Sequence, residues 1–200
     1  MDGWMVVNMN LFVPNSVIAD TLLWIAEEIP GLVHSGDVSR ILADQGYWGS
    51  YNIPFFQDVY NQSGYPAQEE KYGNDYSYEK CPRALIFKRD ASSVKNMDDA
   101  KRIMRYNDYL HDPISKGNPI GGAVAARADL PCSDPKYTEH AFGAVDAKLT
   151  SHSLMTSPGH THTHFAVCGP TTDQQPAFQW SGTSFDSISH VGVPDRHHLE

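Results

Sequence analysis

The sequence is short of positive charge. It holds 15 Lys and Arg residues against 24 Asp and Glu, which gives a formal net charge of −9, and no run of five basic residues occurs. Nucleic acid and anionic membrane surfaces are therefore poor partners at neutral pH. The ten histidines qualify this exclusion, because protonating all of them would bring the formal charge to +1 in an acidic compartment.

Long apolar runs and several well-known motifs are also missing. The longest apolar run, LLWIA over 22–26, is far shorter than the roughly 20 residues of a transmembrane span. The start, MDGWMVVNMNLF, has no positive flank and no small-residue cleavage site, so it is not a signal peptide. GxSxG, HExxH, P-loop and CxxC motifs do not occur. The three cysteines, Cys81, Cys132 and Cys168, leave at least one unpaired and define neither a disulfide framework nor a zinc site.

What is present is the composition of a folded domain. The 200 residues are 40% hydrophobic and 11% aromatic, which argues against disorder. Their number suits a single domain over residues 1–200, and neither an internal repeat nor a linker stands out. Strand and helix patterns both occur, so we expect an α/β or α+β fold.

The patterns predict strands in four places. These are residues 4–12, 32–37, 83–90 and 141–151. The loop composition of residues 111–122, with its Pro and Gly residues, predicts an irregular segment.

Three helices are predicted. Within 18–31, apolar residues recur at helical spacing and Pro30-Gly31 would end the helix. A second helix is expected over 55–64, ending at a glycine. A third would begin at Ser92 or Ser93 and reach about Tyr106, with acidic residues before basic ones, as the helix dipole favours.

One stretch, GYWGSYNIPFFQDVYNQSGYP over 46–66, gathers seven aromatic residues, and the polar residue among them that we single out is Asn52. It is either aromatic core or the wall of a pocket with a polar group pointed into it. We single out Asn52 with Arg83, because an amide NH₂ can stabilise a developing oxyanion and a guanidinium can lower the pKa of a thiol. Spacing alone favours a structural interpretation, in which Asn52 lies in a turn before Pro54 and Arg83 starts a strand.

Two further candidates each have a plainer alternative. Cys81 is close to Arg83 in sequence and is a candidate nucleophile, but nothing pairs it with a base. A buried small hydrophobe or half of a disulfide is the better interpretation. His111 and Asp112 could form an acid–base dyad, but adjacent residues seldom face one another, which favours a helix end followed by a turn.

The histidine-rich run HTHTH is the only pattern that suggests a metal. His160, His162 and His164 would share one face of an extended strand, within reach of one ion. Histidines in a loop rich in Thr, Pro and Gly are the commoner case, and the sequence marks no outside ligand.

Seven motifs, taken in order, resemble those of phospholipase B-like proteins, a family that includes the lamina ancestor and lysosomal forms. The motifs are IPGLVHSGD, GYWGSYNIPFFQDVYNQSGYP, KYGNDYSYEKCPRALIFKRD, MRYNDYLHDPIS, AARADL, GAVDAKLTS and CGPTTDQQPAFQWS. The resemblance extends over residues 4–195. It is poorest over 114–122 and in a divergent histidine-rich segment, 152–170.

The resemblance implies an N-terminal-nucleophile hydrolase with an αββα sandwich, in which self-cleavage exposes a nucleophilic cysteine. The implied reaction is hydrolysis of an acyl ester or amide, in a phospholipid or an N-acyl compound, through an acyl-enzyme and without a cofactor. By position, Asn52 would donate to the oxyanion, and Arg83 would lie against the nucleophile and favour its thiolate.

The family's nucleophilic cysteine lies upstream of every residue present here, and Cys81 stands at a structural position. We therefore expect residues 1–200 to be the C-terminal portion of such a hydrolase, inactive alone and completed by a missing N-terminal half. With half of a sandwich missing, the isolated chain should self-associate. The resemblance also implies a lysosomal or secreted protein, with a glycan at the sequon Asn61-Gln62-Ser63.

Two hypotheses from other classes remain open. The aromatic wall could serve a non-catalytic lipid- or partner-binding module, and the histidine-rich segment could serve a metal-binding protein.

Overall fold

The chain is seen here in a computed structural model that describes residues 1–158 and 164–197. It has two compact units, residues 1–92 and 93–200. Helices are mixed with antiparallel strands, so the fold is α+β, as expected. The expectation that residues 1–200 form one domain stays a prediction, because two compact units can belong to one domain.

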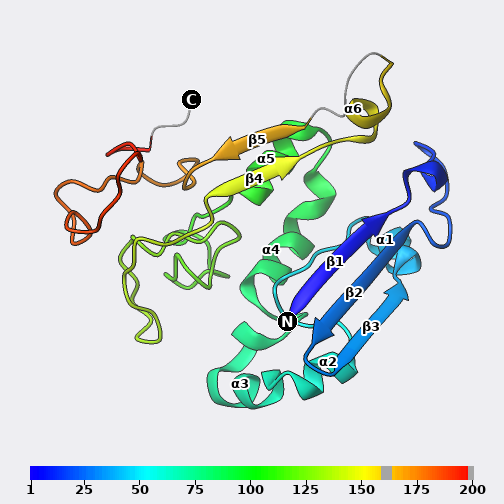
Figure 1. The fold of residues 1–200 in the computed structure, drawn as a ribbon, viewed down its shortest axis with the longest axis horizontal. Helices are drawn as coiled ribbons and strands as arrows, with labels where there is room; N and C mark the ends of the chain where they lie inside the picture. Colours follow the sequence, from blue (N-terminus) through cyan, green and yellow to red (C-terminus); the bar gives the residue numbers. More distant parts are fainter. Residues whose placement is uncertain (159–163, 198–200) are drawn as a thin grey trace. The chain divides into compact units, whose positions relative to one another are not determined.

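The first unit begins with a three-stranded antiparallel sheet (Figure 1). Its strands are β1 (Asp2–Val7), β2 (Leu23–Ile29) and β3 (Leu32–Asp37), in the order β1-β2-β3. The predicted strand at 32–37 is confirmed. The predicted strand at 4–12 is displaced: β1 ends at Val7, and a short 3-10 turn, Met9–Leu11, follows.

The helix predicted over 18–31 is wrong, because residues 23–29 form the central strand β2. Alternate residues of β2 are buried: Leu23, Ile25, Glu27 and Ile29. Glu27 breaks the apolar alternation by which a half-buried strand is recognised in a sequence. Its carboxylate can be buried because it accepts hydrogen bonds from the backbone N–H groups of Phe55 (2.8 and 3.0 Å) and Phe56 (3.0 Å).

The two faces of this sheet differ. On one face, Leu23, Ile25 and Val38 form a buried cluster, against which partly buried side chains pack: Ile41, Leu42, Trp48, Phe55 and Phe56. The other face leaves large apolar side chains of all three strands exposed: Trp4, Val6, Trp24 and Val33. On the first face only the edge strand β1 leaves large apolar side chains exposed, those of Met5 and Val7.

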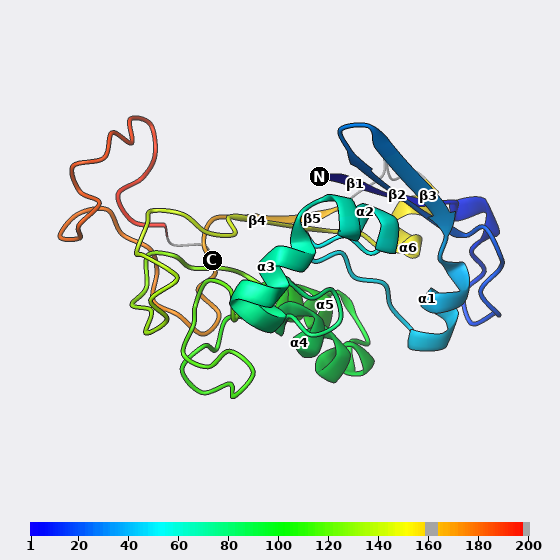
Figure 2. The same ribbon diagram turned by 90° about the horizontal axis from the view of Figure 1, so that it is seen from below.

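Four helices complete the first unit: α1 (Ser39–Gln45), α2 (Gln57–Gln62), α3 (Tyr65–Tyr72) and α4 (Pro82–Asp90) (Figures 1 and 2). The helix predicted over 55–64 is confirmed as α2. The strand predicted over 83–90 is wrong, because this segment is α4. Pro82 occupies its first turn, where a missing N–H costs nothing, and Ala84 and Ile86 are buried.

The second unit has few regular elements: α5 (Met97–Met104), α6 (His152–Thr156) and an antiparallel pair, β4 (Asp146–Leu149) and β5 (Phe165–Cys168) (Figure 1). Helix α5 confirms the third predicted helix, but it begins later. Its N-cap is Asn96, whose side chain accepts a hydrogen bond from the N–H of Asp99. The predicted strand at 141–151 is shortened to β4, and residues 111–122 form no helix or strand, as expected.

Buried polar side chains hold the loops of the second unit. Arg127, 1% exposed, pairs with both carboxylate oxygens of Asp129 at 2.7 Å and donates to the carbonyls of Thr171 (2.6 Å) and Pro176 (2.9 Å). Arg105 donates to the carbonyls of Gly169 and Pro170. The motif GPTTDQQPAFQW, for which the sequence suggests no chemistry, thus supplies carbonyls to two buried guanidinium groups.

Candidate functional site

Asn52 stands at an unusual point of the backbone. Its φ is 59°, in the left-handed region that asparagine tolerates better than most residues do. Both neighbours, Tyr51 and Ile53, are buried in a cluster with Cys81 and Ala84, whereas the side chain of Asn52 is exposed. The Tyr65 hydroxyl donates to the backbone carbonyl of Asn52 at 2.5 Å. The core therefore fixes the backbone on each side and presents the amide to solvent.

Arg83 fixes the orientation of that amide. Its Nη1 group donates to Oδ1 of Asn52 at 2.8 Å, across 31 residues of sequence. A guanidinium has only donors, so the amide atom that faces it must be the oxygen. The Asn52 NH₂ group is directed away from Arg83 and donates no hydrogen bond within the part of the chain that the structure describes. The pair singled out from the sequence is thus brought together, with one amide donor to spare.

Asn52 lines an open cavity of about 550 Å³ within the first unit. The other lining residues are Met1, Gly3, Ile29, Pro30, Ser50, Gln62, Ser63 and Tyr65. The volume falls within the range of about 300–1,000 Å³ that is usual for small-molecule sites. The arrangement can hydrogen-bond an oxygen that carries developing negative charge.

Most aromatic residues of the stretch 46–66 do not line the cavity of Asn52. Tyr47, Trp48, Tyr51 and Phe55 line a different cavity, one that does not include Asn52. The two interpretations of this stretch are therefore both partly right. Tyr51 is core and cavity wall together, while the next residue, Asn52, points into a separate cavity.

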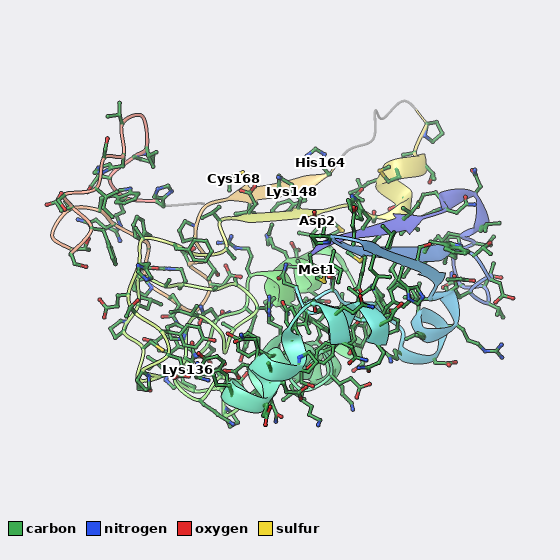
Figure 3. All side chains as sticks on the ribbon, turned by 60° about the horizontal axis from the view of Figure 1, so that its bottom comes forward. Met1, Asp2, Lys136, Lys148, His164 and Cys168 are labelled. Carbon is green, nitrogen blue, oxygen red and sulfur yellow. The ribbon has the colours of Figure 1, made fainter. Side chains whose placement is uncertain are left out.

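Cys81 has the surroundings of a structural residue. It is 1% exposed at the N-cap of α4, and burial raises the pKa of its thiol, an effect that the nearby Arg83 charge only partly offsets. All three cysteines are present as free thiols: Cys81 is buried, Cys132 is half-buried and Cys168 is exposed. Cys168 ends β5 and His164 precedes that strand (Figure 3).

The histidine-rich run is only partly covered by the described residues. His160 and His162 lie outside the described residues, and His164 is exposed. No group of three or more His, Cys, Asp or Glu side chains that could hold a metal occurs in residues 1–158 and 164–197. The metal-binding hypothesis, which depends on all three histidines, is thus left as a prediction.

His111 and Asp112 do not form a dyad. The His111 ring pairs with Asp108 at 2.7 Å, while Asp112 is buried and accepts a hydrogen bond from the Tyr106 hydroxyl at 2.8 Å. The alternative interpretation, a helix end followed by a turn, is right about the turn, which covers residues 109–111, but helix α5 ends seven residues before His111, at Met104.

Sequence reasoning missed one exposed pair in the first unit. Nδ1 of His34, on β3, lies 2.7 and 2.8 Å from the two carboxylate oxygens of Asp58 on α2, and the imidazole stacks on Phe56 with ring centroids 3.8 Å apart. The hydrogen bond from His34 lowers the pKa of Asp58. The two residues are 24 positions apart, and no local pattern signals such a pair.

These observations define an α+β protein in which a guanidinium orients an amide group at a cavity. No helix among the described residues is both long and apolar enough to cross a membrane. The family model described as phospholipase B matches residues 1–200, and the chain belongs to this family.

Individual relatives agree with this assignment. Phospholipase B-like protein G of Dictyostelium discoideum is 42% identical over 202 residues, which is 96% of this chain and 33% of the relative. Putative phospholipase B-like 2 is 43% identical in Mus musculus and 41% in Homo sapiens, each over 204 residues, 96% of this chain and 34% of the relative. The chain therefore spans about a third of the length of the curated relatives it matches.

Proposed function

We propose that residues 1–200 contribute an oxyanion donor to an acyl hydrolase of the N-terminal-nucleophile type. The observation that carries the proposal is the hydrogen bond from Arg83 to Oδ1 of Asn52, which leaves the Asn52 NH₂ group directed away from Arg83, on a side chain that lines a cavity. The relatives' names point to phospholipids as the substrate class. An N-acyl compound would meet the same donor, because esters and amides both pass through a tetrahedral oxyanion.

In this scheme Asn52 donates from Nδ2 to the oxygen on which charge develops. Arg83 has two roles: it holds the amide plane, and its positive charge favours the thiolate of an attacking cysteine. Tyr65, through the Asn52 carbonyl, holds the backbone at the left-handed position. The donor is in place before the reaction, so little reorganisation is needed as charge forms.

The nucleophile is proposed to come from sequence outside residues 1–200. Cys81 is a poor candidate because it is buried and its pKa is raised. The relatives are about three times as long as this chain and have room for such a residue. We expect the 200-residue chain alone to be inactive.

Turnover of a lysophospholipid and of an N-acyl amide tests this scheme. The isolated chain should show none. Activity that survives repurification and is lost in Asn52→Ala would overturn the expected inactivity. In a longer form that is active, Asn52→Ala should lower kcat by about 10²–10³-fold. Asn52→Asp should lower it similarly, because a carboxylate cannot donate, whereas Asn74→Ala, outside the cavity, should leave kcat unchanged.

The exposed sheet face supports the rest of the proposed fold. An αββα sandwich packs a second sheet on one face of the first, and here the face that carries Trp4, Val6, Trp24 and Val33 is exposed. We infer that a second sheet, supplied by the remainder of the enzyme, covers it. The isolated chain should then self-associate, and Trp4→Ser with Val6→Ser should reduce this association. A clean monomer by light scattering would contradict the inference.

A lysosomal or secreted location is proposed on the same family grounds. Asn61 is exposed on α2, where its Oδ1 accepts a hydrogen bond from Gln57 at 2.8 Å, so a glycan can be attached there. The two residues that follow it, Gln62 and Ser63, line the Asn52 cavity. Enzymatic deglycosylation of protein from a secretory host should lower its mass, and Asn61→Gln should abolish that shift. An unchanged mass in the parent chain would contradict glycosylation.

A further inference from the structure

The aromatic cavity of the first unit is separate from the cavity of Asn52. Its volume is about 790 Å³, and the two share no lining residue. It lies among α1, the segments 47–55 and 78–80, and helix α4. The lining residues are Ile41, Gln45, Tyr47, Trp48, Gly49, Tyr51, Phe55, Tyr78, Glu79, Lys80, Ala84, Leu85 and Lys88.

The aromatic wall offers mainly ring surface, together with the buried Nε1 donor of Trp48, which has no hydrogen-bond partner among the described residues. Trp48 and Phe55 meet edge to face, with centroids 4.7 Å apart, and Phe55 meets Tyr78 in the same way at 5.3 Å. The Tyr78 hydroxyl is already used, because it donates to the carbonyl of Gly49 at 2.7 Å. Burial raises the pKa of the Tyr78 phenol, so it carries no charge at neutral pH. This wall is suited to a hydrocarbon group.

Positive charge prevails among the charged side chains of the lining. Lys80 precedes the N-cap of α4, and Lys88 lies one turn beyond Ala84 on that helix. Both are exposed, and neither pairs with a carboxylate of the described residues. Glu79 is the one acidic side chain of the described lining. A ligand that fits is therefore apolar along most of its length and anionic at one end.

We propose that this cavity binds a long-chain fatty acid anion. Its hydrocarbon chain lies against Trp48, Phe55 and Leu85, and its carboxylate is held by Lys80 and Lys88. The site takes no part in bond breaking and does not depend on Asn52, so it stands whether or not the proposed hydrolase activity is correct.

Calorimetric titration of the 200-residue chain with palmitate, below its critical micelle concentration, tests the proposal. Each methylene that is buried should strengthen binding about fourfold, so laurate should bind at least about tenfold more weakly than palmitate. Hexadecanol, which has the chain without the charge, should also bind more weakly. Equal affinity for hexadecanol and palmitate would overturn the proposal, as would no binding of palmitate.

Exposed lining residues give variants that should still fold. Lys80→Gln and Lys88→Gln should each weaken palmitate binding about three- to fivefold, and Leu85→Glu should weaken it at least about tenfold. Lys71→Gln removes the same charge from α3, outside the cavity, and should have no effect. Thermal unfolding midpoints equal to that of the parent chain confirm that these variants fold. Undiminished palmitate binding by the Lys80→Gln/Lys88→Gln double variant would overturn the assignment, and so would its loss in Asn52→Ala.

Discussion

The two units each contain an arginine that matters to the structure, Arg83 in the first and Arg127 in the second, and the two differ in burial and in hydrogen bonding. Arg127 is 1% exposed, and Asp129 and two backbone carbonyls take up its donors. Arg83 is half-buried, and its one hydrogen bond to a side chain of the described residues goes to Asn52. A buried guanidinium with four of its five N–H donors bonded holds loops together. One with donors to spare can orient another group and still act on a ligand.

The largest expected effect follows from removing the buried guanidinium of Arg127. Arg127→Met leaves the Asp129 carboxylate and the carbonyls of Thr171 and Pro176 without their partner. We expect the free energy of unfolding, measured with urea, to fall by about 3–5 kcal/mol. Adding Asp129→Leu should recover part of this loss, because the unpaired charge is then gone. A loss below about 1 kcal/mol would show that Arg127 is not the clamp described.

For the arginines, the accessible side chain is in the first unit and the buried one is in the second. For the cysteines the order is the opposite, because the accessible thiol is in the second unit. Cys168 is exposed, whereas Cys81 is buried and burial raises its thiol pKa. Iodoacetamide should therefore modify Cys168 at least about tenfold faster than Cys81 in the folded chain at neutral pH. Peptide mass mapping over time measures both rates, and denatured chain, in which the two should react alike, is the control. A faster Cys81 would mean that Arg83 activates its thiol despite the burial.

Removing Arg83 should cost little stability. Arg83→Ala breaks one hydrogen bond at an exposed amide, so the free energy of unfolding should fall by about 1 kcal/mol or less. In an active longer form, the same change should lower kcat, because the Asn52 amide is no longer held. Arg89→Ala is the matched control, because it removes the same group from α4 outside both cavities and should leave kcat unchanged. A loss of stability as large as that of Arg127→Met would make Arg83 a structural residue.

The parts of this fold that could be predicted are those set by local pattern. The strand at 32–37, the helix at 55–64 and the charge order of α5 need only neighbouring residues. Strand β2 resembles a helix in sequence because Glu27 occupies a buried position, and the backbone groups that satisfy it come from Phe55 and Phe56, 28 and 29 residues away. Helix α4 was predicted as a strand, although Pro82 at its start is a helix signal.

Local pattern was not enough to predict the candidate site. The chemistry of the two side chains singles out Asn52 with Arg83, spacing alone favours a structural interpretation of both, and the family resemblance reverses that preference. The hydrogen bond between them spans 31 residues, and both the left-handed backbone at Asn52 and the helix that carries Arg83 are needed to form it. Such a pair is a product of tertiary structure, which no periodicity of the sequence encodes.

The smallest expected effect comes from the His34–Asp58 pair, which is exposed where the Arg127–Asp129 pair is buried. The hydrogen bond from His34 lowers the pKa of Asp58 below its ordinary value of 3.8. A carboxyl whose pKa is lowered by folding adds stability above that ordinary value and loses it as the pH falls through the folded-state pKa. The test is thermal unfolding of the parent chain and of Asp58→Asn from about pH 5 to about pH 2. The parent chain should be slightly more stable than the variant at about pH 5, and this difference should vanish at about pH 2. A difference that grew as the pH fell would mean that the charged form of Asp58 is not the one His34 stabilises. Both side chains are over a third exposed, so solvent screening should keep this effect well below that of Arg127→Met.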